Sequence, residues 1–120
     1  MVTNDEIQEA YGELCAAYDV AISRAIDEME AREALVNMEA SMLASEVITG
    51  SNAETRNAKL KIATAEQRET LHEETIAKKN ADAAVALCQL EIESYKWQIR
   101  NTDNLLREKE LKGRNTRNDS

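Results

Sequence analysis

The chain has 120 residues, which corresponds to one domain at most. Phe and Pro are absent, aromatic residues make up 3% and charged residues 32% of the chain, so the composition favours long helices or a coiled coil over any sheet. No apolar run approaches the roughly 18 residues of a membrane span and no leader opens the chain. We therefore expect a soluble, cytoplasmic protein with no membrane partner.

The formal net charge of −8 is distributed unevenly along the chain. Residues 1–95 carry about −11 and residues 96–120 about +3. Neutralising the phosphates of a nucleic acid needs a cationic surface, and only the segment from Arg107 to Arg117 could supply one. Nucleic acid is therefore an unlikely partner, and the basic end is interpreted as a solvated tail.

A first helix is predicted from about residue 4 to residue 48. Thr3-Asn4-Asp5-Glu6 has the pattern of a capping box, in which the Thr side chain accepts from the Glu amide. The apolar positions recur every eleven residues, which predicts a nearly straight helix. A second, weaker stripe lies on the order of 100° away. The repeating sets are Ile7, Tyr18, Met29, Ala40; Tyr11, Ile22, Ala44; and Leu14, Ala25, Val36, Val47; the weaker stripe is Val20, Leu35, Met38, Met42.

The stretch 49–52 is predicted to be the turn of a helical hairpin. Gly50 can adopt the left-handed conformation that ends a helix without a Cβ clash. Ser51-Asn52-Ala53-Glu54 then has the capping-box pattern, with Ser51 as the capping residue and the Glu54 side chain reaching back. The site residues assigned to the turn are Gly50, Ser51, Asn52 and Glu54.

A second helix is predicted from about residue 53 to residue 100. The residues of its packing seam repeat every seven positions, and a further apolar stripe lies on nearly the opposite face. Asn101 to Asn104 favour a turn, but the seam continues through Leu106, so a continuous helix and a separate short helix over 104–112, closed by Gly113, both stay open. The domain would span 1–112, followed by a flexible tail over 113–120. The seam is Ala81, Val85, Cys88, Ile92, Tyr95 and Ile99, and the opposite stripe is Ile76, Ala83, Leu90 and Trp97.

The predicted turn pairs residue i with roughly residue 101−i. This register places Glu33 opposite Arg68 as an interhelical pair. It also places Cys15 within about one turn of Cys88, although packed helices lie 8–10 Å apart, beyond the usual reach of a disulfide. We expect two buried free thiols, with a disulfide left as the alternative.

Apolar stripes on two faces of each helix predict self-association. One partner helix cannot cover both stripes, and the seam between the two helices is rich in Ala and returns little buried area. We expect a homo-oligomer, most simply a two-fold dimer that forms a four-helix bundle. Its interface is assigned to Ile76, Ala83, Leu90 and Trp97, with Trp97 near the centre.

No set of residues for catalysis can be assembled from the sequence. The chain has one histidine, and Glu69-Thr70-Leu71-His72 fits the Glu-x-x-His spacing of di-iron bundles, with Glu28 or Glu33 as further ligands. Such spacings arise by chance in Glu-rich helices, and a solvated imidazole is the preferred interpretation. We expect a non-enzyme with no catalytic residues, no metal and no cofactor.

The segment from Gly50 to Leu60 resembles a turn in small phage-encoded helical proteins of unassigned function. The pattern there is Gly-Lys-Asn followed by Arg, Ala and Leu at the spacings of Arg56, Ala58 and Leu60. Ser51 stands here where Lys is common. The resemblance covers about a tenth of the chain. It implies a phage accessory protein made in the bacterial cytoplasm, and it implies no activity and no site residues.

The sequence is compatible with three candidate functions. The first is an interaction protein, a self-associating helical hairpin that binds or modulates another protein. The second is an acidic inhibitor that imitates DNA to block a host nuclease or defence enzyme, although the acids of the first helix are spaced at about 6 Å against one phosphate per 1.7 Å in duplex DNA. The third is a nucleic-acid accessory protein that uses its basic tail.

Overall fold

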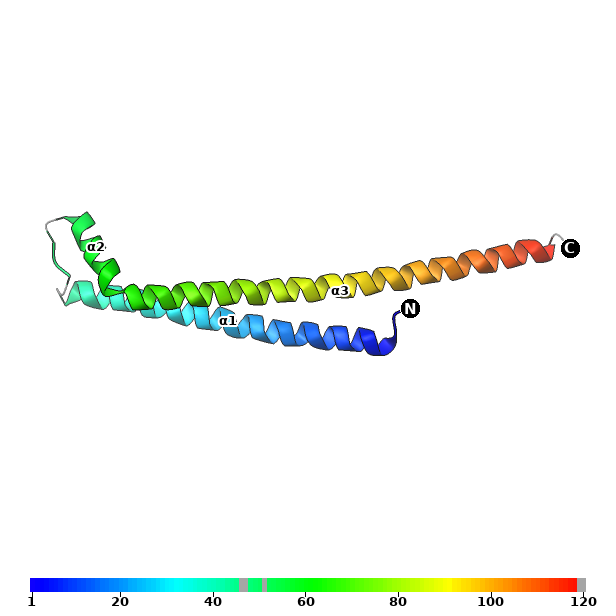
Figure 1. Cartoon of the computed structure of the whole chain (residues 1–120), viewed down its shortest axis with the longest axis horizontal. Coiled ribbons are helices and arrows are strands. Elements are labelled where there is room, and N and C mark those ends of the chain that lie inside the picture. The colour runs from blue at the N-terminus through cyan, green and yellow to red at the C-terminus, as the bar shows by residue number, and fades with distance from the viewer. Residues whose placement is uncertain (46–47, 51, 119–120) are drawn as a thin grey trace. The chain divides into compact units, whose positions relative to one another are not determined.

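In the computed structural model the chain is all-α (Figure 1). The structure describes residues 1–45, 48–50 and 52–118, with side chains up to residue 113, and no strand occurs in this part of the chain. Its elements are α1 (Asn4–Ala44), α2 (Ala53–Ala63) and α3 (Ala65–Asn118). The predicted all-α class is confirmed.

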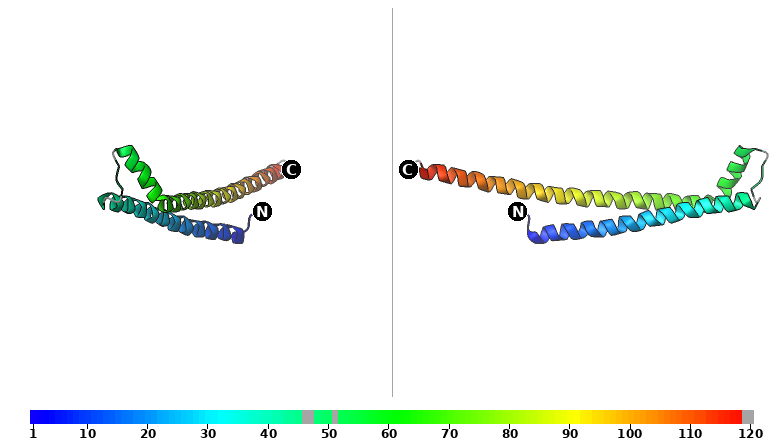
Figure 2. Two further views of the ribbon diagram at one scale, coloured as in Figure 1. Left: turned by 60° about the vertical axis from the view of Figure 1, so that its left-hand side comes forward. Right: turned by 180° about the vertical axis from the view of Figure 1, so that it is seen from behind.

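The chain divides into two compact units. The terminal unit consists of Met1–Ala17 and Ala84–Ser120, and the loop unit consists of Tyr18–Ala83. Within each unit a part of α1 lies beside a part of α3 and runs in the opposite direction (Figures 1 and 2). The expected pairing of antiparallel helices, the architecture of a helical hairpin, is therefore present.

The predicted seam of the second helix is confirmed from Val85 to Tyr95 in the terminal unit, whereas Ile99, also assigned to it, is exposed. Val85 and Ile92 are buried, Cys88 and Tyr95 are half-buried, and Ala10 of α1 is buried with them. Heptad spacing explains this, because residues seven apart return to one face after two turns. Burial of these β-branched side chains supplies the main apolar contact of the unit.

The start of α1 is also as expected. The Glu6 backbone amide donates to Thr3 Oγ1 at 3.2 Å, so Thr3 caps the first turn. The helix ends at Ala44 rather than at residue 48. Ser45 follows it, and its hydroxyl donates to the Met42 carbonyl at 3.3 Å.

The turn differs from its prediction in two ways. The φ of Gly50 lies outside the left-handed region, so this residue does not end the helix through a positive φ. A Cβ at Gly50 would instead lie 3.1 Å from Thr55 Cγ2 and 3.2 Å from Arg56 Cγ, so Gly permits a close approach of loop and helix. The capping residue of α2 is Asn52, whose Oδ1 accepts from the Thr55 amide at 2.8 Å. Ser51, the predicted cap, lies outside the described residues.

The predicted second helix is divided at Thr64. The side chain of Thr64 is fully buried, its hydroxyl donates to the Leu60 carbonyl at 2.7 Å, and its φ and ψ of −106° and 19° end α2. Figure 1 shows α2 at an angle to the beginning of α3. Ile48 of the connection and Leu60 of α2 are both buried. Lys59 Nζ of α2 donates a hydrogen bond to the Thr49 carbonyl of the connection at 2.7 Å. The connection is thus a packed segment rather than a tight turn.

No break occurs at Asn101 to Asn104, and no separate helix over 104–112 forms. The hydroxyl of Thr102 donates to the Gln98 carbonyl at 2.9 Å, so this side chain bonds within the helix instead of competing with it. α3 passes Gly113 and continues to Asn118, so most of the predicted tail is helical.

The predicted register is wrong. Arg68 Nη2 donates to Glu39 Oε1 at 2.7 Å, and Glu33 is exposed. The expected 101−i rule assumed a tight turn, whereas the segment from Ser45 to Thr64, which includes α2, separates the paired helices. Both cysteines are free, as expected, but only Cys88 is half-buried, and Cys15 is exposed.

Candidate interaction surface

The predicted interface of α3 faces away from α1. In the terminal unit Leu90 and Trp97 retain 60% and 63% of their accessible surface, and in the loop unit Ile76 and Ala83 are also exposed. The face of α3 that packs against α1 is formed by Val85 and the other seam residues. The second stripe lies on another face and is therefore in solvent. Whether it is an interface between copies stays a prediction.

Sequence reasoning missed two leucines of this face. Leu87 lies three residues before Leu90 and is exposed, as is Leu111, two heptads after Trp97. The signal for Leu111 was present in the seven-residue spacing, and the signal for Leu87 in its three-residue spacing to Leu90. We define Leu90, Trp97 and Leu111, all in the terminal unit, as the α3 stripe.

A second outward face lies on α1 in the loop unit. Ile22, Met29, Val36 and Leu43 recur every seven residues and are exposed, and we define these four residues as the α1 stripe. The eleven-residue grouping had placed Ile22, Met29 and Val36 in three different sets and had left Leu43 out. A seven-residue line of large apolar side chains on a helix is typical of a surface that packs against another helix.

The two stripes predicted for α1 do not separate into an inward and an outward face, because Ile7 and Leu14 of the main sets are half-buried and Val20 of the weaker stripe is exposed. Leu35 is buried and Met38 and Met42 are half-buried, although these residues were assigned to the weaker, second stripe. Val36 and Met29 were assigned to the main stripe and are exposed. The small residues Ala21 and Ala31 lie inward and permit α3 to approach, which directs the larger side chains outward.

The inward face of the loop unit is partly polar. Glu28 is half-buried on α1 and binds Arg32 at 3.0 Å. On α3, Gln67 Oε1 and Glu74 Oε2 are buried and have no hydrogen-bond partner among the described residues. Buried polar atoms without partners cost free energy. These two atoms therefore carry a desolvation cost, which the buried apolar residues Leu35 and Leu60 of the same unit offset.

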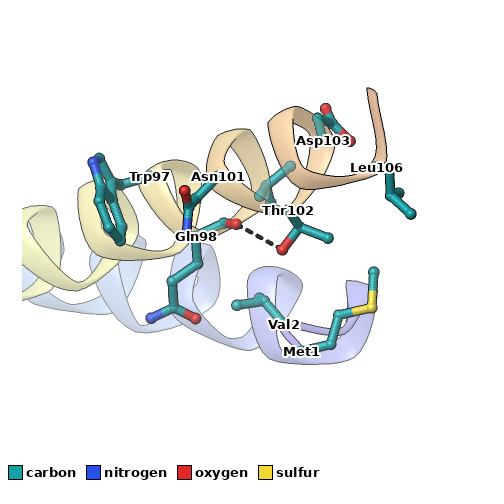
Figure 3. A pocket seen from close by; sticks show the side chains of 9 residues that line it. Met1, Val2, Trp97, Gln98, Asn101, Thr102, Asp103 and Leu106 are labelled. Carbon is teal, nitrogen blue, oxygen red and sulfur yellow. Dashed lines mark hydrogen bonds between the residues drawn. The ribbon is translucent and has the colours of Figure 1, made fainter. Parts of the chain in front are cut away.

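A shallow cavity of about 280 Å³ lies at the end of α1 in the terminal unit (Figure 3). Met1 and Val2 lie under the turns of α3 that carry Thr102 and Leu106, and Trp97 borders the same cavity. Because α1 begins at Asn4, the turns of α3 beyond Leu106 lie past the end of α1. The cavity has no cluster of reactive side chains and is a gap at a helix end.

Carboxylates of the terminal unit raise the pKa of Tyr95. The pKa of Tyr95 is raised above its ordinary value of 10.0, chiefly because its hydroxyl donates a hydrogen bond to Glu91 Oε1 at 3.0 Å. Desolvation and the negative charges of Glu91, Glu6 and Glu13 act in the same direction. The two glutamates of α1 thus place a negative field beside this part of α3.

The residues considered for metal binding are not brought together. Glu69 and His72 are exposed on α3. Among the side chains that the structure describes, no three His, Cys, Asp or Glu gather into a group that could hold a metal ion. Within the same part of the chain, no helix combines the length and the hydropathy needed to cross a lipid bilayer.

Comparison with known proteins identifies no relative of this chain. No protein-family model matches this chain, and no curated protein or solved structure matches it either. The function of the protein is therefore inferred from the α1 stripe, the α3 stripe and the charged residues beside them.

Proposed function

We propose that this protein is a non-enzymatic helical interaction protein that self-associates and binds or modulates another protein. The observation that supports the proposal is the exposure of Leu90 and Trp97 on the face of α3 opposite the seam. Large apolar side chains gathered on one helix face cost roughly 25 cal/mol for each Å² left in water. A partner helix would remove that cost.

A two-fold dimer in the form of a four-helix bundle is the simplest assembly of this kind. Each helix of a bundle contacts two neighbours, and helices with two apolar faces suit that arrangement. Trp is enriched among the residues that contribute most to association, which favours Trp97 as a central contact.

The resemblance of Gly50 to Leu60 to a turn in phage-encoded helical proteins supports a phage accessory role in the bacterial cytoplasm. The expected partner is then a host or virion protein. Affinity capture from the bacterial host, followed by mass spectrometry, tests this part of the proposal. Specific capture of one protein, lost in Leu90→Asp, is the expected result, and capture that does not depend on Leu90 contradicts it.

Light scattering of the wild type and two variants tests self-association. Trp97→Ala should cost on the order of 2 kcal/mol of association free energy. Leu90→Asp should cost more, because the contact would bury an unpaired charge. Glu110→Ala is the matched control, since Glu110 is exposed on α3 and lies about 100° around the helix from the neighbouring stripe residue Leu111. A wild type that is monomeric at high concentration refutes the self-association.

A further inference from the structure

The break between α2 and α3 lies at a single residue, Thr64. The Thr64 amide donates to the Leu60 carbonyl at 2.9 Å, and the Arg68 amide donates to the Thr64 carbonyl at 2.9 Å, so the hydrogen-bond pattern of an α-helix is present on both sides of the break. The φ and ψ of Thr64 are −106° and 19°. They depart by roughly 40° and 60° from ordinary helical values. A modest rotation at this residue therefore separates a bent helix from a continuous one.

The sequence around Thr64 suits a continuous helix. No Gly or Pro stands between Ala53 and Lys112. Thr64 lies three heptads before the seam residue Val85 and is buried, and Leu60, one turn earlier, is buried as well. A helix that ran straight through Thr64 would keep both residues on the face toward α1.

Contacts with the connection, residues 45–52, hold α2 in the bent form that Figure 1 shows. Lys59 Nζ donates to the Thr49 carbonyl at 2.7 Å. Gly50 approaches the first turn of α2 so closely that a Cβ there would lie 3.1 Å from Thr55 Cγ2. A movement of α2 into line with α3 would break these contacts. In exchange, the continuous form would gain the regular backbone hydrogen bonds of the helical turn around Thr64.

The connection is long enough to permit the continuous form. Because Arg68 binds Glu39, an α3 extended back to Ala53 would begin roughly 15 Å beyond the end of α1, at the usual 8–10 Å between packed helices. The residues 45–52 can reach about 26–29 Å. The extended helix would run along the last turn of α1, where Leu43 keeps 48% of its accessible surface.

We propose that Thr64 is a hinge, at which α2 moves between the bent form and a form continuous with α3. The hydrogen bond from Lys59 to Thr49 holds the bent form, and the helical preference of the sequence around Thr64 favours the continuous form. The hinge goes beyond the proposed function, because it concerns the shape of one chain and needs no second copy. A partner that binds one form more tightly than the other would shift the balance between them.

A distance measured between α2 and α3 tests the hinge. Asn57→Cys on α2 and Asn80→Cys on α3 supply two exposed positions for spin labels, and Cys15→Ser and Cys88→Ala remove the native thiols. Labelled protein diluted with unlabelled protein limits pulsed electron paramagnetic resonance to distances within one chain. A continuous helix separates the two labelled backbones by roughly 34 Å, and the bend shortens this distance.

The wild-type background should give both distances. Lys59→Ala removes the hydrogen bond to Thr49 and should raise the fraction of the longer distance at least twofold. Lys61→Ala is the matched control, because Lys61 is a second exposed lysine of α2, and it should leave this fraction unchanged. Thr64→Gly should lower the fraction, because Gly is a poorer helix former than Thr.

The Lys59 variant keeps the test decisive if the buried Thr64 position does not tolerate Gly, since Lys59 is exposed. One short distance in every protein would show a rigid bend, and one long distance in the wild-type background would show no bend. Either result overturns the hinge. Equal changes in Lys59→Ala and Lys61→Ala would also overturn it, because the contact with the connection would then not hold the bent form.

Discussion

Arg68 of α3 donates from Nη2 to Glu39 Oε1 of α1 at 2.7 Å, and this ion pair joins the two helices of the loop unit. The same guanidinium donates from Nε to Thr64 Oγ1 at 3.1 Å, and Thr64 Oγ1 donates to the Leu60 carbonyl at 2.7 Å. One arginine therefore connects α1, the start of α3 and the end of α2.

Replacing Arg68 by Ala should lower the free energy of unfolding by about 1 kcal/mol. The side chains of Arg68 and Glu39 are 39% and 28% exposed, so solvent screening keeps the loss modest. Arg32→Ala is the control, because Arg32 binds Glu28 within α1 and is more exposed. Urea denaturation measures both. Equal losses would show that the contact between α1 and α3 adds nothing beyond a surface pair.

Thr64→Val should lower the free energy of unfolding by about 1–2 kcal/mol. The substitution keeps the shape of a fully buried side chain but removes its hydroxyl, so Arg68 Nε loses its acceptor. Thr70→Val is the matched control, because the Thr70 hydroxyl also donates to a carbonyl four residues earlier, at 3.1 Å, but is exposed. Thermal denaturation of both variants checks the difference. Similar melting temperatures would argue against a structural role for the Thr64 hydroxyl.

The seam and the start of α1 could be predicted because their signals are local. Val85 and Ile92 are β-branched and seven residues apart, and that spacing alone places them on one face. Thr3 caps α1 through a bond to an amide three residues later. Neither feature depends on where the partner helix lies.

The register and the outward stripe of α1 depend on distant parts of the chain. Whether Arg68 meets Glu33 or Glu39 is decided by the segment between the helices, which contains α2 and its end at Thr64. A threonine in the sequence does not by itself predict the end of a helix. On α1, small Ala21 and Ala31 lie inward while Met29 lies outward. A reading that placed the largest apolar residues inward could not foresee this.

Asn52→Ala should lower the free energy of unfolding by about 1 kcal/mol, because the first turn of α2 loses the acceptor for the Thr55 amide. Asn57→Ala is the control, since Asn57 is exposed inside α2 and Ala is the better helix former there. In thermal denaturation, Asn52→Ala should therefore lower the melting temperature and Asn57→Ala should raise it. If Asn52→Ala is neutral, another residue caps α2 in solution.

The hydrogen bond between Tyr95 and Glu91 predicts a defined pH dependence. Since the pKa of Tyr95 is raised in the folded chain, folding favours the neutral phenol. This contribution to stability is complete below the ordinary tyrosine pKa of 10.0 and is lost as the pH rises through the higher folded value. Stability should consequently fall more steeply in alkali for the wild type than for Tyr95→Phe.

Glu91→Gln should lower the pKa of Tyr95 towards its ordinary value, because the strongest acceptor loses its charge and its Coulombic effect disappears. The titration of Tyr95 is obtained as the difference in tyrosinate absorbance between each protein and its Tyr95→Phe counterpart. Glu93→Gln is the matched control, since Glu93 lies on α3 near Tyr95 but is not among the groups that raise its pKa. Some elevation should remain in Glu91→Gln, because Glu6 and Glu13 of α1 still act on the phenol. Tyr95 titrating alike in wild type and Glu91→Gln would mean that the phenol and the carboxylate are not bonded in solution.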